Sequence, residues 1–319
     1  MTKVITEKFA FTEYTDGIYF NGKAAAIAFE VPAFQGTVSG YTSTGAPSND
    51  IIDKFSFAAD SNATDVGDLT VSRGFAAGQS SAESGYTSGG LPVTNVIDKF
   101  PFTVDANATD VGDLTQARQY VAGCSHIVNG YGWTAGGQTP TTVNTIDKFA
   151  FAADGNATDV GNLSLARWGA TGQSSEVSGY VSGGQDPTRL TIDKFPFAAD
   201  ANATDVGNLS IGRVKPAGQS STVSGYTSGG LIPTTWWNAI DKFPFAADAN
   251  ATDVGDLTQN RQASGGQSST ASGYTSGGYG PSAPVSYNTI DKFPFASNAN
   301  ATDVGDLTVS RGGTAGQQV

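Results

Sequence analysis

Apolar positions in this chain recur at every second residue rather than at every third or fourth. The clearest case is the segment Ile-Asp-Lys-Phe-Pro-Phe at 97–102, in which two aromatic rings are two positions apart. This spacing places both rings on the same face of a β-strand. No long stretch has the period of a helix. The pattern therefore predicts an all-β chain built from short strands.

The alternating segments belong to a repeat. The string Ile-Asp-Lys-Phe occurs at 52–55, 97–100, 146–149, 192–195, 240–243 and 290–293. Each copy is followed by Asn-Ala-Thr-Asp-Val-Gly and then by an arginine at a fixed place: Arg73, Arg118, Arg167, Arg213, Arg261 and Arg311. A small-residue stretch then leads into Gly-Tyr-Thr-Ser-Gly-Gly at 85–90, 225–230 and 273–278, and into the variant Gly-Tyr-Val-Ser-Gly-Gly at 179–184. The spacing of 45 to 50 residues is typical of β-propeller blades.

Each repeat predicts four short strands. The small-residue stretch is the inner strand, Ser-Gly-Tyr-Thr-Ser the second, Ile-Asp-Lys-Phe-Pro-Phe the third and Val-Gly-Asp-Leu-Thr the outer one. Glycines end the second strand, where backbone segments pass closely. Of the 18 phenylalanines, 14 lie in Lys-Phe-x-Phe segments. We expect these rings to form the core between neighbouring blades.

The two ends of the chain indicate how the ring closes. The inner strand expected before Tyr41 is degenerate, whereas the chain ends after Arg311 in a segment that matches only an inner strand. We therefore expect 312–319 to complete the first blade and to hide the sheet edges. The predicted fold is an all-β, six-bladed propeller of four-stranded blades, closed by the C-terminal strand. The alternative is a seven-bladed ring. Residues 1–35 are predicted to be an N-terminal arm for attachment or oligomerisation, and 36–319 the propeller.

Composition narrows the class of protein. The net charge is −12, yet only 14% of the residues are charged, so the surface is largely neutral and suits an extracellular or virion protein. The N-terminus lacks the pattern of a secretory signal, and no stretch is long and apolar enough for a membrane span. Most basic residues occupy repeated positions, which leaves no basic patch. We expect neither membrane insertion nor nucleic-acid binding.

Candidates for catalysis or metal binding are few. Cys124 is the only cysteine and His126 the only histidine, which excludes a multi-cysteine metal site and a two-histidine copper site. The two residues share a strand face, but without a third ligand they do not predict a metal site. The repeated Asp-x-Asn-x-Thr-Asp turns resemble calcium loops yet lack the glycine and closing glutamate. Asx turns account for the same residues without a metal, and the sequence does not decide whether these turns bind calcium.

The remaining carboxylates recur in every copy, which indicates a structural role. We expect the aspartates of Ile-Asp-Lys-Phe to pair with the repeated lysine or arginine. No motif supports a Ser-His-Asp triad. The sequence therefore predicts no enzyme, no catalytic residue and no cofactor.

Length and chemistry vary almost only in one loop per blade, between Gly-Gly and Ile-Asp-Lys-Phe. These loops span 91–95, 138–144, 185–190, 231–238 and 279–288. In a four-stranded blade they emerge on the same face, and variable loops on a rigid scaffold commonly build a binding surface. Drift in tolerant loops is the alternative. Because aromatic side chains anchor sugars and protein partners, the predicted ligand-binding residues are Trp236, Trp237, Tyr279 and Tyr287.

The order of the motifs resembles the kelch repeat over 36–319: tyrosine before Gly-Gly, a variable loop, Asn-x-Ile-Asp-Lys-Phe, Val-x-x-Leu and arginine. The tryptophan that kelch repeats carry before their last strand is replaced by Ala-Thr-Asp-Val-Gly. The modules are also similar to repeat proteins encoded by marine bacteriophages.

The phage resemblance implies a non-enzymatic structural or adhesive protein of a virion, such as a tail fiber or capsid appendage. Its arm would bind other virion proteins, and its loops a host surface glycan or protein. The alternative function is that of a lectin-like carbohydrate-binding propeller, secreted or at a cell surface.

Overall fold

The structure is a computed structural model of the 319-residue chain. Described in full are residues 34–46, 49–185, 190–281 and 285–319, and by their backbone alone 13–14, 17–20 and 23–24. Most of the predicted arm, and the loop segments 186–189 and 282–284, lie outside the described residues.

The chain divides into two compact units, Met1–Pro32 and Ala33–Val319. The described backbone of the first unit forms a three-stranded antiparallel sheet of β1 (Glu13–Tyr14), β2 (Gly17–Phe20) and β3 (Lys23–Ala24).

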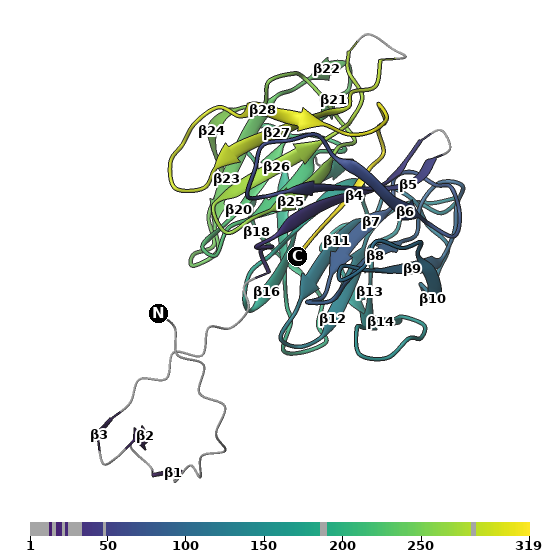
Figure 1. Ribbon diagram of the computed structural model, residues 1–319. Helices are drawn as coiled ribbons and strands as arrows, with labels where there is room; N and C mark the ends of the chain where they lie inside the picture. The colour runs from purple at the N-terminus through teal and green to yellow at the C-terminus, as the bar shows by residue number, and fades with distance from the viewer. Residues whose placement is uncertain are drawn as a thin grey trace. The chain divides into compact units, whose positions relative to one another are not determined.

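The second unit is a β-propeller, whose described residues form six four-stranded antiparallel sheets around a common centre (Figure 1). Blade 1 consists of β29 (Ala315–Gln318), β4 (Ser39–Gly45), β5 (Asn49–Ser56) and β6 (Thr64–Asp68). Blade 2 consists of β7 (Ala77–Ser80), β8 (Ser84–Ser88), β9 (Val96–Pro101) and β10 (Thr109–Asp113). Blade 3 consists of β11 (Ala122–His126), β12 (Tyr131–Ala135), β13 (Thr145–Ala150) and β14 (Thr158–Asn162).

The other three blades repeat this arrangement. Blade 4 consists of β15 (Trp168–Ser174), β16 (Ser178–Gln185), β17 (Thr191–Pro196) and β18 (Thr204–Asn208). Blade 5 consists of β19 (Ala217–Ser220), β20 (Ser224–Ser228), β23 (Ala239–Pro244) and β24 (Thr252–Asp256), with the hairpin of β21 (Leu231–Ile232) and β22 (Thr235–Trp236) in its loop. Blade 6 consists of β25 (Gly265–Ser268), β26 (Ser272–Ser276), β27 (Thr289–Pro294) and β28 (Thr302–Asp306).

The C-terminal strand closes the ring. β29 pairs with β4 in antiparallel register, with Gln317 opposite Tyr41. The carbonyl oxygen of Val319 accepts hydrogen bonds from the N–H groups of Thr37, Val38 and Ser39. The predicted six-bladed fold, with its first blade completed from the C-terminus, is confirmed.

Aromatic side chains pack between the blades as the phenylalanine pattern predicts. The ring of Tyr41 in blade 1 lies 5.6 Å from Phe100 and 4.8 Å from Phe102 in blade 2, measured between ring centroids. In blade 3, Trp133 stands where the other blades have tyrosine, and its ring lies 4.4 Å from Phe197. Each of these contacts joins one blade to the next, so the core is distributed around the ring.

The inner strands approach one another so closely that each needs a glycine at the same level. A Cβ atom added at Gly218 would clash with the carbonyl oxygen of Gly172 in the preceding blade. The same relation continues around the ring through Gly78, Gly123, Gly172, Gly266 and Gly316. Because only glycine lacks a Cβ, no other residue fits there without moving the backbone.

Each repeated arginine is buried and pairs with the aspartate of Ile-Asp-Lys-Phe in the next blade. The pairs are Arg73–Asp98, Arg118–Asp147, Arg167–Asp193, Arg213–Asp241, Arg261–Asp291 and Arg311–Asp53. These pairs confirm the structural role predicted for the aspartates. Five of the six repeated lysines instead reach exposed aspartates in the turns of the next blade, as Lys292 does at Asp60.

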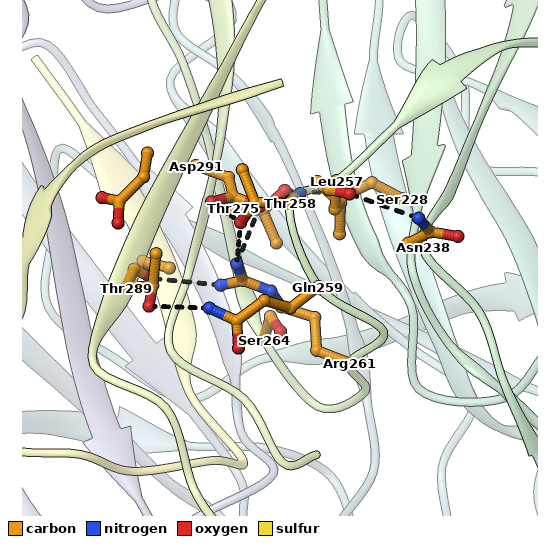
Figure 2. Close-up of polar contacts among 12 residues, drawn as sticks. Ser228, Asn238, Leu257, Thr258, Gln259, Arg261, Ser264, Thr275, Thr289 and Asp291 are labelled. Carbon is orange, nitrogen blue, oxygen red and sulfur yellow. Dashed lines mark hydrogen bonds and ion pairs between the residues drawn. The ribbon is translucent and has the colours of Figure 1, made fainter. Parts of the chain in front are cut away.

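The Arg261–Asp291 pair shows how the buried charges are satisfied (Figure 2). The guanidinium Nη2 lies 2.7 Å from the Asp291 carboxylate, and Nη1 donates to the carbonyl oxygen of Thr289 at 3.0 Å. Thr258 donates both its backbone N–H and its hydroxyl to the same carboxylate. Burial lowers the pKa of Arg261, and the Asp291 charge opposes that shift.

Candidate binding site on the loop face

The variable loops and the segments that join one blade to the next lie on the same face of the propeller. The residue that follows each repeated arginine bridges to the start of a loop between the second and third strands. These bridges are Gly74–Leu91, Gln119–Gln138, Trp168–Gln185, Val214–Leu231, Gln262–Tyr279 and Gly312–Ala46. We call this side of the propeller the loop face.

A closed ring of six backbone hydrogen bonds surrounds the central axis on the loop face. Each N–H donates to the carbonyl oxygen of the equivalent residue in the preceding blade at 2.6–2.9 Å. The ring residues are Phe75, Tyr120, Gly169, Lys215, Ala263 and Gly313. All six have a left-handed backbone, with φ between 57° and 72°. We call this ring the mouth, because it surrounds a cavity of about 100 Å³ at the end of the inner strands.

The side chains of the mouth gather into a cluster of three aromatic rings and one lysine. The Lys215 Nζ lies 4.6 Å from the ring centroid of Tyr120, 4.9 Å from that of Phe75 and 5.6 Å from that of Trp168. Ring centroids of Phe75 and Tyr120 are 4.5 Å apart, and those of Tyr120 and Trp168 are 5.1 Å apart. Since Phe75 and Lys215 stand on opposite sides of the mouth, the cluster lies over its centre.

Lys215 is held by these rings rather than by a carboxylate. In the part of the chain that the structure describes, its Nζ has no ion-pair partner. Burial lowers the pKa of Lys215, and burial raises the pKa of the neighbouring Tyr120. A half-buried ammonium beside aromatic faces is stabilised by cation–π attraction but keeps three N–H donors for an acceptor.

The predicted residues Trp236 and Trp237 lie in the loop of blade 5, and both are half-buried. Trp236 ends β22 and pairs with Leu231 in the inserted hairpin. The backbone of Trp237 donates to Gly230 at 2.9 Å, and its indole Nε1 is buried without a hydrogen-bond partner. The loop therefore shields the polar edge of the Trp237 indole from solvent.

The predicted residues Tyr279 and Tyr287 belong to the loop of blade 6 and point to different places. The Tyr279 hydroxyl donates to the carbonyl oxygen of Ala46 at 2.8 Å, and its ring lies 6.5 Å from Phe75 at the mouth. Tyr287 lies over the guanidinium of Arg261 at 5.7 Å and so covers a buried ion pair. Of the four predicted residues, Tyr279 is the one in ring contact with the mouth cluster.

Sequence reasoning missed Phe75, Tyr120, Trp168 and Lys215, which form the mouth cluster. A signal was present. The residue two places after each repeated arginine changes from blade to blade, through Phe75, Tyr120, Gly169, Lys215, Ala263 and Gly313. Loop length does not change at this position, so a comparison of lengths passes over it.

Cys124 and His126 do not meet at a site. The Cys124 sulfur is buried against the carbonyl oxygens of Gln173 and Tyr180. The His126 Nδ1 accepts from the backbone of Asn129, and its Nε2 lies 2.7 Å from the carbonyl oxygen of Glu176. In the described ranges, no group of three or more His, Cys, Asp or Glu side chains can hold a metal ion.

Burial raises the pKa of Cys124 to about 12, so its thiolate is scarce at neutral pH. We expect a disulfide reagent that releases a coloured thiolate to react with the native protein far more slowly than with the unfolded protein. The measurement is the absorbance of that thiolate with and without denaturant. Equally fast reaction of both states would contradict the burial of this thiol.

Comparisons with known proteins support the fold. No family model matches the sequence, and no curated protein matches it significantly. Among solved structures, YjhT resembles this chain with a TM-score of 0.64 and 12% sequence identity, over 77% of this chain and 88% of that one. At this identity the likeness shows the fold alone. The chain is a six-bladed β-propeller. Among the described residues, there is no helix that is long and apolar enough to cross a membrane.

Proposed function

We propose that this propeller is a non-enzymatic recognition protein of a phage virion, on a tail or capsid appendage, and that it binds its partner through the loop face. We also propose that its blades are related to kelch repeats and to the repeat proteins of marine bacteriophages. The observation that carries the proposal is the mouth cluster, an unpaired lysine among aromatic rings at the centre of the face where the variable loops gather.

The repeated charged residues support a scaffold role for the rest of the propeller. Every repeated arginine is paired with an aspartate inside the frame, and five of the six repeated lysines pair with aspartates: Lys54, Lys99, Lys148, Lys194 and Lys292. Groups that are bound to each other in this way are not available to a substrate. Chemistry that differs between blades is concentrated on the loop face, as in other proteins that bind through loops on a rigid frame.

The entry of the chain into the propeller supports display of the loop face. The Gly36 N–H donates to the carbonyl oxygen of Ser268 at 2.8 Å, and the Gln35 side chain donates to Ser220 at 3.2 Å. Both serines end inner strands on the side opposite the loop face. We propose that the preceding residues attach to other virion proteins, which leaves the loop face free for a host surface glycan or protein.

A lectin-like propeller, secreted or at a cell surface, is the second candidate function. The aromatic rings at the mouth favour it, because sugars stack on aromatic faces. The two candidates share a binding face and differ in location. Detection of the protein in virus particles therefore separates them.

Replacement of Trp236 and Trp237 by alanine is expected to abolish binding to host cells or to a glycan array, because it removes the aromatic surface of one variable loop. The control is Val177→Ser with Val223→Ser, two valines that are 68% and 65% exposed on the opposite face. Binding is measured by flow cytometry with labelled protein, after both variants are shown to melt as the parent does. Equal binding by both variants would refute recognition through this loop.

A further inference from the structure

Lys215 differs from the other lysines of the propeller in both place and partner. It is the one lysine after residue 33 that lies outside the repeated Ile-Asp-Lys-Phe positions. Lys292 and four of its five equivalents reach carboxylates, whereas the Lys215 ammonium lies among three rings and forms an ion pair with no described carboxylate. The three N–H donors of this ammonium are therefore available to an acceptor from outside the protein, and an anionic group would also neutralise its charge.

The backbone shows that these side chains stand at the mouth at a conformational cost. Gly169 and Gly313 adopt the left-handed conformation without strain. The other four residues of the mouth adopt it with a Cβ atom, at φ of 57° in Phe75, Tyr120 and Lys215 and 58° in Ala263. Residues held in this region often mark a functional site. Two blades complete the same hydrogen-bonded ring with glycine, so the ring does not itself require the larger side chains.

The two halves of the mouth differ in size. Phe75 and Tyr120 are large and stand beside Trp168, whereas Ala263 and Gly313 are small. The aromatic half presents flat faces on which a ring of a ligand can stack. The half with Ala263 and Gly313 leaves space for the rest of that ligand. With a cavity of about 100 Å³, the mouth suits one ring-sized group rather than an extended chain.

We infer that the mouth cluster binds an acidic sugar residue, with Lys215 holding its anionic group and the aromatic rings stacking on the sugar. This inference rests on the proposed recognition function and names the ligand class. Ammonium groups form charge-assisted hydrogen bonds with carboxylates and sulfates, and aromatic faces pack against the apolar faces of sugars. A neutral sugar satisfies the rings but leaves the ammonium unpaired.

Binding of four polymers to the full chain tests the inference at physiological ionic strength. The polymers are polygalacturonate, which carries carboxylates, dextran sulfate, which carries sulfate esters, neutral dextran, and polyglutamate as an acidic peptide. We expect one or both acidic polysaccharides to bind and neutral dextran and polyglutamate not to bind. The comparison of polygalacturonate with dextran sulfate identifies which anionic group is preferred. Failure of both acidic polysaccharides to bind, or equal binding of polyglutamate, would overturn the inference.

Three lysine variants separate a site from general charge attraction. Lys215→Met keeps the apolar stem and removes the charge, and we expect its affinity to fall by roughly tenfold or more, as for loss of a charge-assisted hydrogen bond. Lys215→Arg keeps the charge and retains most of the affinity. The matched control is Lys242→Met, because Lys242 also lies over a tyrosine ring, 5.8 Å from the centroid of Tyr226. Equal loss in Lys242→Met and Lys215→Met would overturn the inference.

The aromatic part is tested by Tyr120→Leu, which removes a ring and keeps an apolar side chain. We expect this variant to lose affinity for the acidic polysaccharide while its melting temperature stays close to that of the parent. Unchanged affinity would overturn the stacking role of the ring. If the Trp236 and Trp237 variant abolishes host binding but Lys215→Met does not affect any acidic polysaccharide, the recognition function stands and the acidic-sugar site fails.

Discussion

Replacement of Asp291 by alanine is expected to lower the free energy of unfolding by about 3–5 kcal/mol, the usual cost of leaving one member of a buried ion pair without its partner. The change leaves the Arg261 guanidinium buried opposite no carboxylate. It also removes the acceptor of both hydrogen bonds from Thr258. Denaturant unfolding followed by tryptophan fluorescence measures the effect.

The neighbouring Lys292 provides the control for this prediction. It pairs with Asp60 at 2.9 Å, but the two side chains are 30% and 57% exposed. An exposed pair of this kind contributes about 0–1 kcal/mol, so Lys292→Ala should leave stability nearly unchanged. Asp291→Asn keeps the shape of the side chain and removes its charge. We expect its loss of unfolding free energy to lie between those of Lys292→Ala and Asp291→Ala. A loss below about 1 kcal/mol for Asp291→Ala would show that the buried pairs do not hold the blades together.

Removal of 315–319 is expected to have the largest effect on the fold, because these residues contain the inner strand of blade 1. β4 would lose one of its two partner strands, and the Gln317 side chain would no longer donate to the carbonyl oxygen of Tyr86 in blade 2. An unpaired strand at the ring opening is prone to association. We expect the melting temperature to fall by more than about 10 °C, at about 2–4 °C per kcal/mol for a domain of this size, and the protein to form oligomers.

A peptide with the sequence of 312–319 gives a specific control for the truncation. If β29 acts by pairing with β4, this peptide added in excess restores part of the lost melting temperature, whereas a scrambled peptide does not. Calorimetry and size-exclusion chromatography measure the two effects. A truncated protein that melts close to the parent and stays monomeric would contradict closure by the C-terminal strand.

Much of this fold was predictable because the sequence motif of one blade is repeated six times along the chain. The recurring Ile-Asp-Lys-Phe segments gave the third strands, and the unmatched ending after Arg311 gave the closure. The recurrence of the aspartate in every copy indicated that it pairs with the repeated lysine or arginine. Only the structure shows that the buried partner of the aspartate is the arginine and not the lysine.

The mouth was not predictable in the same way, because its properties arise from the ring and not from any one blade. The left-handed backbone at Phe75, Tyr120 and Lys215 is set by hydrogen bonds between successive blades. Phe75 and Lys215, which belong to repeats that do not follow one another, become neighbours only when the ring closes. The contact of Tyr287 with Arg261 was also not predictable, because loop length and residue type do not show which residues a loop side chain contacts.

The mouth and the variable loops together give the loop face two kinds of variation. The loops differ in length at the periphery, and the mouth differs in side-chain chemistry at the axis. The inner frame stays constant beneath both, held by the glycines of the inner strands and by the arginine–aspartate pairs. Such a division allows the residues of the loop face to change without altering the packing of the blades.

The measurement that tests the central claim most directly is quantitative mass spectrometry of purified virus particles and of cell fractions from the source that encodes this chain. Our account predicts that the protein is found in the particles at a fixed ratio to the capsid or tail proteins. Its presence only in cell envelope or secreted fractions would contradict a virion role and favour the lectin-like propeller.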